Sequence, residues 1–165
     1  MRKLAFINII DETRKLIIYQ SDEGVFLFGY DCLQDTSSKW DNWFMTVEEA
    51  EDYCRDVYKI EDDKWIYISD PLENCQHDFI MPTKVKGREI EKPEYGKFET
   101  LINSKWVDID IKDKYYSLDG LTGNERLFVT GLIDEFDKAK KSDKSKARLI
   151  LSVLEFDEKS IERIV

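Results

Sequence analysis

His77, the only histidine of the chain, lies in a polar stretch over residues 70–78. Cys75 precedes it by two positions, so both side chains point to the same side if the backbone is extended. A thiol beside an imidazole is the arrangement of an activated cysteine nucleophile, and with the adjacent Asp78 it could also bind a soft metal ion. The sequence therefore offers Cys75, His77 and Asp78 as its catalytic candidates.

This constellation is weak chemical evidence, because nucleophiles, bases and metal ligands normally come from separate segments of a chain. Neighbouring carboxylates also raise the pKa of a thiol and so oppose its activation. We favour a structural role for the three residues, and we predict no metal and no cofactor. The chain contains none of the short motifs typical of nucleotide-binding loops, serine hydrolases or zinc metalloproteases.

The charge of the chain is concentrated in one region. Residues 21–80 carry sixteen acidic and four basic side chains, a net charge of −12, whereas the whole chain of 165 residues has a net charge of −10. The same region has eleven aromatic residues, which favours folding over disorder in so charged a stretch. A folded surface of this charge repels nucleic acid and anionic membranes and attracts basic proteins. We therefore expect a basic protein partner, no nucleic acid and no membrane.

The binding candidates combine aromatic and acidic residues. Trp40 and Trp43 can anchor a protein interface if they are exposed, although covering the sheet is the more ordinary role for them. Carboxylates from the helix and the turn that follow would supply an acidic rim. The predicted binding residues are Trp40, Trp43, Glu48, Glu51, Asp62 and Asp63.

Local patterns predict the elements of the first half of the chain. β-branched and aromatic runs at 16–19 and 25–30 flank a polar turn that contains Gly24, which predicts a hairpin. Thr46 and Glu49 form a capping box before an apolar face at helical spacing, so a helix should begin there. The stretch 31–41 is expected to be irregular.

Two further strands are expected, at residues 64–68 and near 79–81. Residues 84–96 contain two glycines, a proline and many charges, which is typical of a linker. A second hairpin is predicted over 97–111, and helices should begin at the capping box of Thr122.

These elements predict an α+β fold: an antiparallel sheet with one packed helix, followed by a β-hairpin and two or three C-terminal helices. The expected organisation is an acidic sheet-and-helix domain over residues 1–90 and a hairpin-and-helix part over 91–165. Because a hairpin alone is only marginally stable, the two parts can instead share one core.

The runs Ile18 to Phe28 and Asp70 to Asp78, with Trp43 and the helix expected over 47–58, resemble a group of small bacterial proteins that have no assigned function. The resemblance covers roughly the first half of the chain and implies a bacterial, cytoplasmic protein. Three cysteines cannot all form disulfides within one chain, which agrees with a reducing cytoplasm.

The leading functional hypothesis is a non-enzymatic, acidic binding protein that engages a basic partner, with an immunity-type inhibitor of a toxic nuclease as its narrower form. The alternative is an enzyme, or a metal or small-molecule binder, centred on residues 70–78. A third hypothesis is a homodimer formed through an exposed sheet edge.

Overall fold

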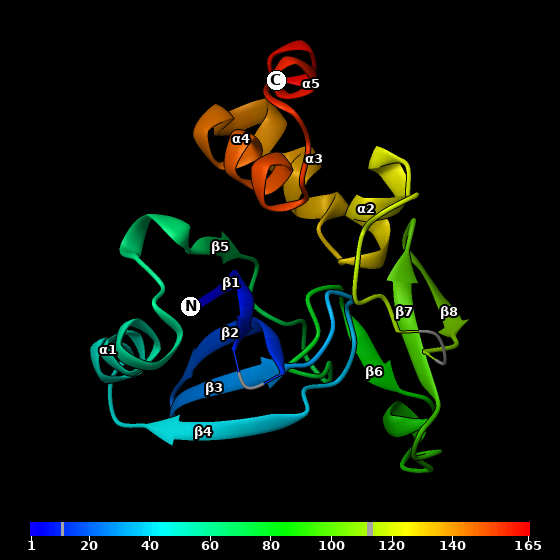
Figure 1. The fold of residues 1–165 in the computed structure, drawn as a ribbon. Helices are drawn as coiled ribbons and strands as arrows, with labels where there is room; N and C mark the ends of the chain where they lie inside the picture. Colours follow the sequence, from blue (N-terminus) through cyan, green and yellow to red (C-terminus); the bar gives the residue numbers. More distant parts are fainter. Residues whose placement is uncertain (11, 112–113) are drawn as a thin grey trace.

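The computed structural model describes residues 1–10, 12–111 and 114–165, and it confirms the α+β class (Figure 1). A five-stranded sheet, here called sheet A, has the strand order β4-β3-β2-β1-β5, and each adjacent pair is antiparallel. Its strands are β1 (Arg2–Ile10), β2 (Thr13–Ser21), β3 (Gly24–Tyr30), β4 (Trp40–Phe44) and β5 (Ile66–Ile68).

The hairpin predicted around Gly24 is confirmed as β2 and β3. The register pairs Ser21 with Gly24, so the turn contains only two residues between the strands. Gly24 has a φ of +137°, a backbone conformation that residues with a side chain rarely adopt. The local sequence thus determines both the turn and the alternation of faces that follows from it.

The prediction that residues 31–41 are irregular is wrong at its end, because Trp40 and Asp41 belong to β4. This strand pairs with β3 over its whole length and forms an edge of sheet A. Its sequence is mostly polar and aromatic, so it lacks the aliphatic run that identifies the other strands. Pairing with β3 supplies the stabilisation that local sequence does not.

Helix α1 (Val47–Tyr58) covers one face of sheet A (Figure 1). Its capping box is confirmed, since the Thr46 hydroxyl accepts from the Glu49 amide and the Glu49 carboxylate accepts from the Thr46 amide. Ala50 and Cys54 are fully buried in a cluster with Leu16, Ile18 and Leu27 of the sheet. The acidic side of the helix faces away from this cluster.

A second sheet, sheet B, has the order β6-β7-β8, from β6 (Thr83–Val85), β7 (Phe98–Ile102) and β8 (Lys105–Ile109). The strand expected near 79–81 does not form there, and the nearest strand is β6. Because β6 pairs with β7, the expected linker 84–96 begins inside a strand and joins two strands of one sheet. Within that linker a short 3-10 helix, η2, spans Arg88–Ile90. Sheet B thus contains strands from both sides of position 90.

The C-terminal part has four helices rather than the two or three predicted, namely α2 (Gly123–Val129), α3 (Ile133–Ser142), α4 (Lys144–Val153) and α5 (Glu158–Ile164). Their apolar residues, such as Phe136, Ile150 and Leu151, join one buried cluster with Leu4 and Ile17 of sheet A. This cluster lies on the face of sheet A opposite α1, and it too combines residues from both sides of position 90. None of the helices in the described residues has both the length and the apolar character that a membrane span requires.

Candidate functional site

The catalytic candidates Cys75, His77 and Asp78 lie in the irregular segment 69–82 that links β5 to β6. Cys75 is buried, whereas His77 is exposed and its ring lies against the ring of Tyr19, with centroids 4.8 Å apart. The carboxylate of Asp78 accepts a hydrogen bond of 2.7 Å from the amide of Ser38. Each of the three side chains thus has its own separate surroundings.

This arrangement does not activate the thiol. Burial raises the pKa of Cys75, and the nearby cations Lys84 and Arg2 offset this only in part. Over residues 1–10, 12–111 and 114–165, no group of three or more His, Cys, Asp or Glu side chains could hold a metal ion. The local spacing alone predicted a shared face, but the segment is not an extended strand at Cys75 and His77.

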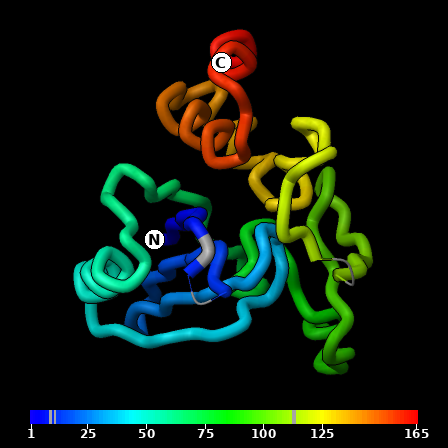
Figure 2. The backbone as a smooth tube through the Cα atoms, viewed as in Figure 1, coloured from blue at the N-terminus to red at the C-terminus, as the bar shows by residue number. Residues whose placement is uncertain are grey.

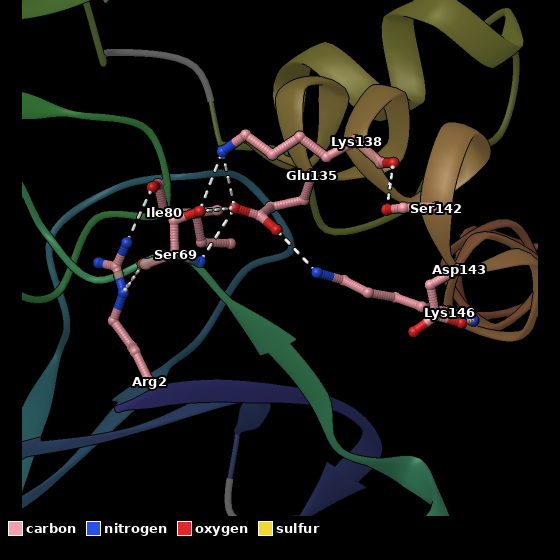
Figure 3. Close-up of polar contacts among 8 residues, drawn as sticks. All are labelled: Arg2, Ser69, Ile80, Glu135, Lys138, Ser142, Asp143 and Lys146. Carbon is pink, nitrogen blue, oxygen red and sulfur yellow. Dashed lines mark hydrogen bonds and ion pairs between the residues drawn. The ribbon is translucent and has the colours of Figure 1, made fainter.

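The segment 69–82 is held by a buried arginine that sequence reasoning missed. The Arg2 guanidinium, at the start of β1, donates to the carbonyls of Ser69, His77, Phe79 and Ile80. Figure 3 draws two of these contacts, to Ser69 at 2.8 Å and to Ile80 at 3.1 Å. Because the segment has no strand neighbour here, Arg2 satisfies carbonyls that would otherwise be buried without a donor.

A buried carboxylate, Asp35, holds the other backbone groups of this segment. It accepts from the amides of Ile80 at 2.7 Å and Met81 at 2.8 Å. Burial raises the pKa of Asp35, while Lys15 and the two amides act in the opposite direction. The turn between α2 and α3 also requires glycine here, because a Cβ at Gly131 would lie 2.6 Å from the Asp35 carboxylate.

Glu135 of α3 is the centre of a third polar contact, between the end of β5 and the C-terminal helices (Figure 3). Its carboxylate accepts from the Ser69 hydroxyl at 2.5 Å, the Ser69 amide at 2.9 Å and Lys146 Nζ at 2.8 Å. Burial opposes the charged form, but these hydrogen bonds outweigh it and lower the pKa of Glu135 to about 2.

This cluster superficially resembles a serine nucleophile with a lysine, since Lys138 Nζ donates to the Ser69 hydroxyl at 2.9 Å. However, the same lysine lies 3.5 Å from the Glu135 carboxylate and acts as its cation. A carboxylate with a pKa of about 2 is a weak base, so it cannot draw a proton from the hydroxyl at neutral pH. The geometry is that of a structural contact between two parts of the fold.

The hollow beside residues 70–78 is too small for an ordinary ligand. It has a volume of about 100 Å³ and is lined by Arg2, Asp70, Gln76 and Glu135 among others, but not by Cys75, His77 or Asp78. Ligand sites usually enclose roughly 300–1,000 Å³. A larger, open cleft of about 950 Å³ lies elsewhere, between the end of β1, the end of α1 and residues 116–117.

The two tryptophans predicted as binding residues lie on opposite faces of sheet A. Residues three apart in a strand point to opposite sides. Trp40 is half-buried on the α1 face, where it stacks on Tyr58 with ring centroids 6.2 Å apart. Trp43 is on the other face and 51% exposed. Only Trp43 is therefore available as an exposed anchor.

Three of the four predicted acidic binding residues have partners within the chain. Glu51 pairs with Lys3, Asp62 with Arg55 at 2.9 Å, and Asp63 with Lys64 at 3.2 Å. The fourth, Glu48, is exposed, and no ion pair engages it in the part of the chain that the structure describes.

Two further carboxylates, Asp56 and Glu61, share these properties with Glu48 and were not singled out from the sequence. We use the name acidic surface for the exposed carboxylates of α1 and of η1 (Asp62–Lys64) with its preceding residue, namely Glu48, Glu49, Asp52, Asp56, Glu61, Asp62 and Asp63. Local spacing was a usable signal for one pair, since Asp52 and Arg55 stand three apart on the helix and pair at 2.5 Å.

Several basic residues of the C-terminal helices also have partners within the chain. Lys138 and Lys146 both pair with Glu135, and Arg148 pairs with Glu158 at 3.2 Å. Lys144 Nζ donates to the C-terminal carbonyl of Val165 at 2.9 Å. Much of the positive charge of these helices is therefore engaged by groups of the same chain.

Comparisons with known proteins supply no further guide to the site. No protein-family model matches the chain, and no curated protein or solved structure shows significant similarity to it.

Proposed function

We propose that this chain is a non-enzymatic binding protein whose acidic surface engages a basic partner protein. The observation that supports the proposal most directly is the exposure of Glu48, Asp56 and Glu61 without an ion pair in the described part of the chain. The negative charge of such a carboxylate is not neutralised by a cation of the same chain, so it attracts positive groups that approach from solvent. An approaching basic protein supplies the missing cations.

Electrostatic complementarity of this kind acts mainly on the rate of association and on the choice of partner. The charge accelerates encounter with a positive surface and disfavours encounter with phosphate groups or anionic lipid. The narrower form of the proposal is an immunity-type inhibitor, in which the acidic surface occupies the positive groove of a toxic nuclease. That form rests on charge alone.

The alternative function centred on residues 70–78, and the homodimer, stay predictions that no specific observation favours. The three candidate side chains Cys75, His77 and Asp78 point into separate surroundings, and the adjoining hollow of about 100 Å³ is not lined by them.

The test compares two variants of equal net charge. Neutralisation of the acidic surface in Glu48→Gln/Asp56→Asn/Glu61→Gln is matched by Asp134→Asn/Asp137→Asn/Glu162→Gln, three exposed carboxylates of the C-terminal helices. Both changes raise the net charge from −10 to about −7. The wild type and each variant are immobilised and exposed, at low and at high salt, to a lysate of cells that naturally produce the protein. The retained proteins are identified by mass spectrometry.

We expect the wild type and the control variant with substitutions in the C-terminal helices to retain a basic protein at low salt. The acidic-surface variant should not retain this protein, and high salt should abolish its retention. Equal retention by both variants would assign the effect to overall charge and contradict the proposal. Retention of only neutral or acidic proteins would also contradict it. Unfolding midpoints measured in parallel should be alike, because all six residues are exposed.

A further inference from the structure

The face of sheet A opposite α1 carries a row of aromatic side chains on three neighbouring strands. The register pairs Tyr19 of β2 with Phe26 of β3, and Phe26 with Trp43 of β4. Neighbouring strands lie about 4.8 Å apart, so the three side chains emerge from adjacent positions on one face. The His77 ring continues the row beyond Tyr19, with centroids 4.8 Å apart. We call Trp43, Phe26, Tyr19 and His77 the aromatic row.

The C-terminal helices do not cover this row. In Figure 2 the cyan strand β4 lies at the edge of the molecule opposite the orange and red helices. The helices contribute to a buried cluster with Leu4 and Ile17, which are fully buried, whereas Phe26 and Tyr19 are half-buried and Trp43 is 51% exposed. This face of sheet A therefore has two parts. The aromatic row is partly exposed to solvent, and the remainder is buried in the core.

The exposed indole is nevertheless held in place. Trp43 lies over the turn of the β2–β3 hairpin, so that a Cβ on Gly24 would be 2.4 Å from its Nε1 atom. The missing side chain at Gly24 is what lets the ring approach the backbone this closely. Phe28 extends the platform further, because its ring is stacked on that of Phe26 at 6.0 Å and 5°. A ring that is already ordered loses little conformational entropy on binding.

Three carboxylates flank the row at its Trp43 end. Asp41 stands two residues before Trp43 in β4, so its side chain emerges on the same face. Asp22 and Glu23 form the exposed turn beside Trp43. Within the described residues no ion pair engages any of these three carboxylates. Two cations project from the same face of sheet A: Arg2, which pairs with Tyr19, and Lys15, which pairs with Tyr30. Both are buried and donate to backbone carbonyls.

We propose that the aromatic row, with Asp22, Glu23 and Asp41, is the docking surface for an arginine-bearing segment of the basic partner protein. A planar guanidinium stacks on aromatic rings and forms paired hydrogen bonds with carboxylates, so it matches both components of the surface. Nucleotide bases also stack on aromatic rows, but their phosphates are repelled by the three carboxylates. The class of partner is taken from the proposed function, on which this inference rests. The docking surface lies on the face of sheet A opposite α1, whereas the acidic surface lies on α1 and around η1.

The test measures binding of two labelled peptides, (Arg-Gly)₄ and (Lys-Gly)₄, by fluorescence anisotropy at low salt. We expect the arginine peptide to bind more tightly than the lysine peptide, since stacking favours guanidinium over ammonium. Trp43→Ala should weaken the arginine peptide about fivefold to tenfold, and Trp43→Phe should restore most of the affinity. The matched control is Trp106→Ala in sheet B, a tryptophan that is 38% exposed and should have no effect.

Several outcomes would overturn the inference. Equal affinity for both peptides, or equal losses in Trp43→Ala and Trp106→Ala, would reduce the interaction to net charge. Binding of a single-stranded oligonucleotide that depends on Trp43 would replace the arginine segment by nucleic acid. Circular dichroism of each variant confirms that a loss of binding is not a loss of folding.

The two proposals can fail separately. If Trp43→Ala still retains the partner from lysate while the acidic-surface variant loses it, the docking surface is wrong and the proposed function stands. If the acidic-surface variant retains the partner and Trp43→Ala loses both partner and arginine peptide, the aromatic row stands and the acidic surface is wrong.

Discussion

The face of sheet A opposite α1 is divided into a covered half and an open half. The covered half presents aliphatic residues such as Leu4 and Ile17, which are fully buried against the C-terminal helices. The open half presents Tyr19, Phe26 and Trp43 at the same alternation along the strands. Both halves follow the same period of two, so the period alone does not distinguish core from surface.

The difference lies in what surrounds each half. Around the covered half, buried charged groups such as Arg2, Asp35 and Glu135 hold the segment 69–82 and the helices in position. Around the open half, the carboxylates Asp22 and Asp41 are exposed and have no internal cation among the described residues. The covered half is therefore held by packing and by buried charges, whereas the open half keeps exposed rings beside carboxylates that no described ion pair engages.

The largest effect is expected from removing the guanidinium of the covered half. Arg2→Met keeps an apolar stem of similar length but leaves the carbonyls of Ser69, His77, Phe79 and Ile80 without this donor. We expect a loss of about 3–5 kcal/mol in the free energy of unfolding, measured by urea denaturation. Arg148→Met, at an exposed ion pair, is the control and should cost less than about 1 kcal/mol. Similar costs for the two variants would contradict the role given to Arg2.

A smaller, pH-dependent effect is expected at Glu135. Its folded pKa of about 2 lies below the ordinary value of 4.5, so its contribution is fully present above that value and is lost as the pH falls toward 2. At pH 7 the wild type should be more stable than Glu135→Gln by roughly 2 kcal/mol, after allowance for solvent screening.

Urea unfolding of both proteins between pH 2 and pH 7 measures this difference. The gap should narrow as the pH is lowered through the range from 4.5 to 2. A double-mutant cycle with Lys146→Met should show a coupling energy that fades over the same range. A gap that stays constant with pH would show that the Glu135 charge is not what holds β5 to the helices.

The smallest effect on stability is expected in the open half. Trp43→Ala removes a side chain that is 51% exposed and lies at a sheet edge, so we expect a cost of about 1–2 kcal/mol. The thermal unfolding midpoint of this variant, compared with Trp106→Ala, provides the measurement. A loss as large as that of Arg2→Met would place Trp43 in the core and remove the contrast between the two halves.

Elements with local causes could be predicted from the sequence. The hairpin around Gly24 and the capping boxes at Thr46 and Thr122 each depend on groups within four residues of one another. The strand β4 could not be predicted, because its own sequence has only a weak β-strand pattern. It forms because it pairs with β3 over its whole length. Of the predicted binding residues, Trp43 and Glu48 are exposed and without an internal ion pair, whereas Trp40 packs on Tyr58 and Glu51 pairs with Lys3.

Sequence patterns were sufficient for the α+β class, the concentration of negative charge in residues 21–80, the hairpin around Gly24 and the starts of α1 and α2. Only the tertiary structure decided which charges are buried and which remain free. Arg2 contacts carbonyls 67 to 78 residues away, and Glu135 contacts Ser69 across 66 residues. No local pattern encodes such a separation, because these partners meet only when the segment 69–82 and the helices pack on sheet A. The same packing ends before β4, and it therefore leaves the aromatic row open.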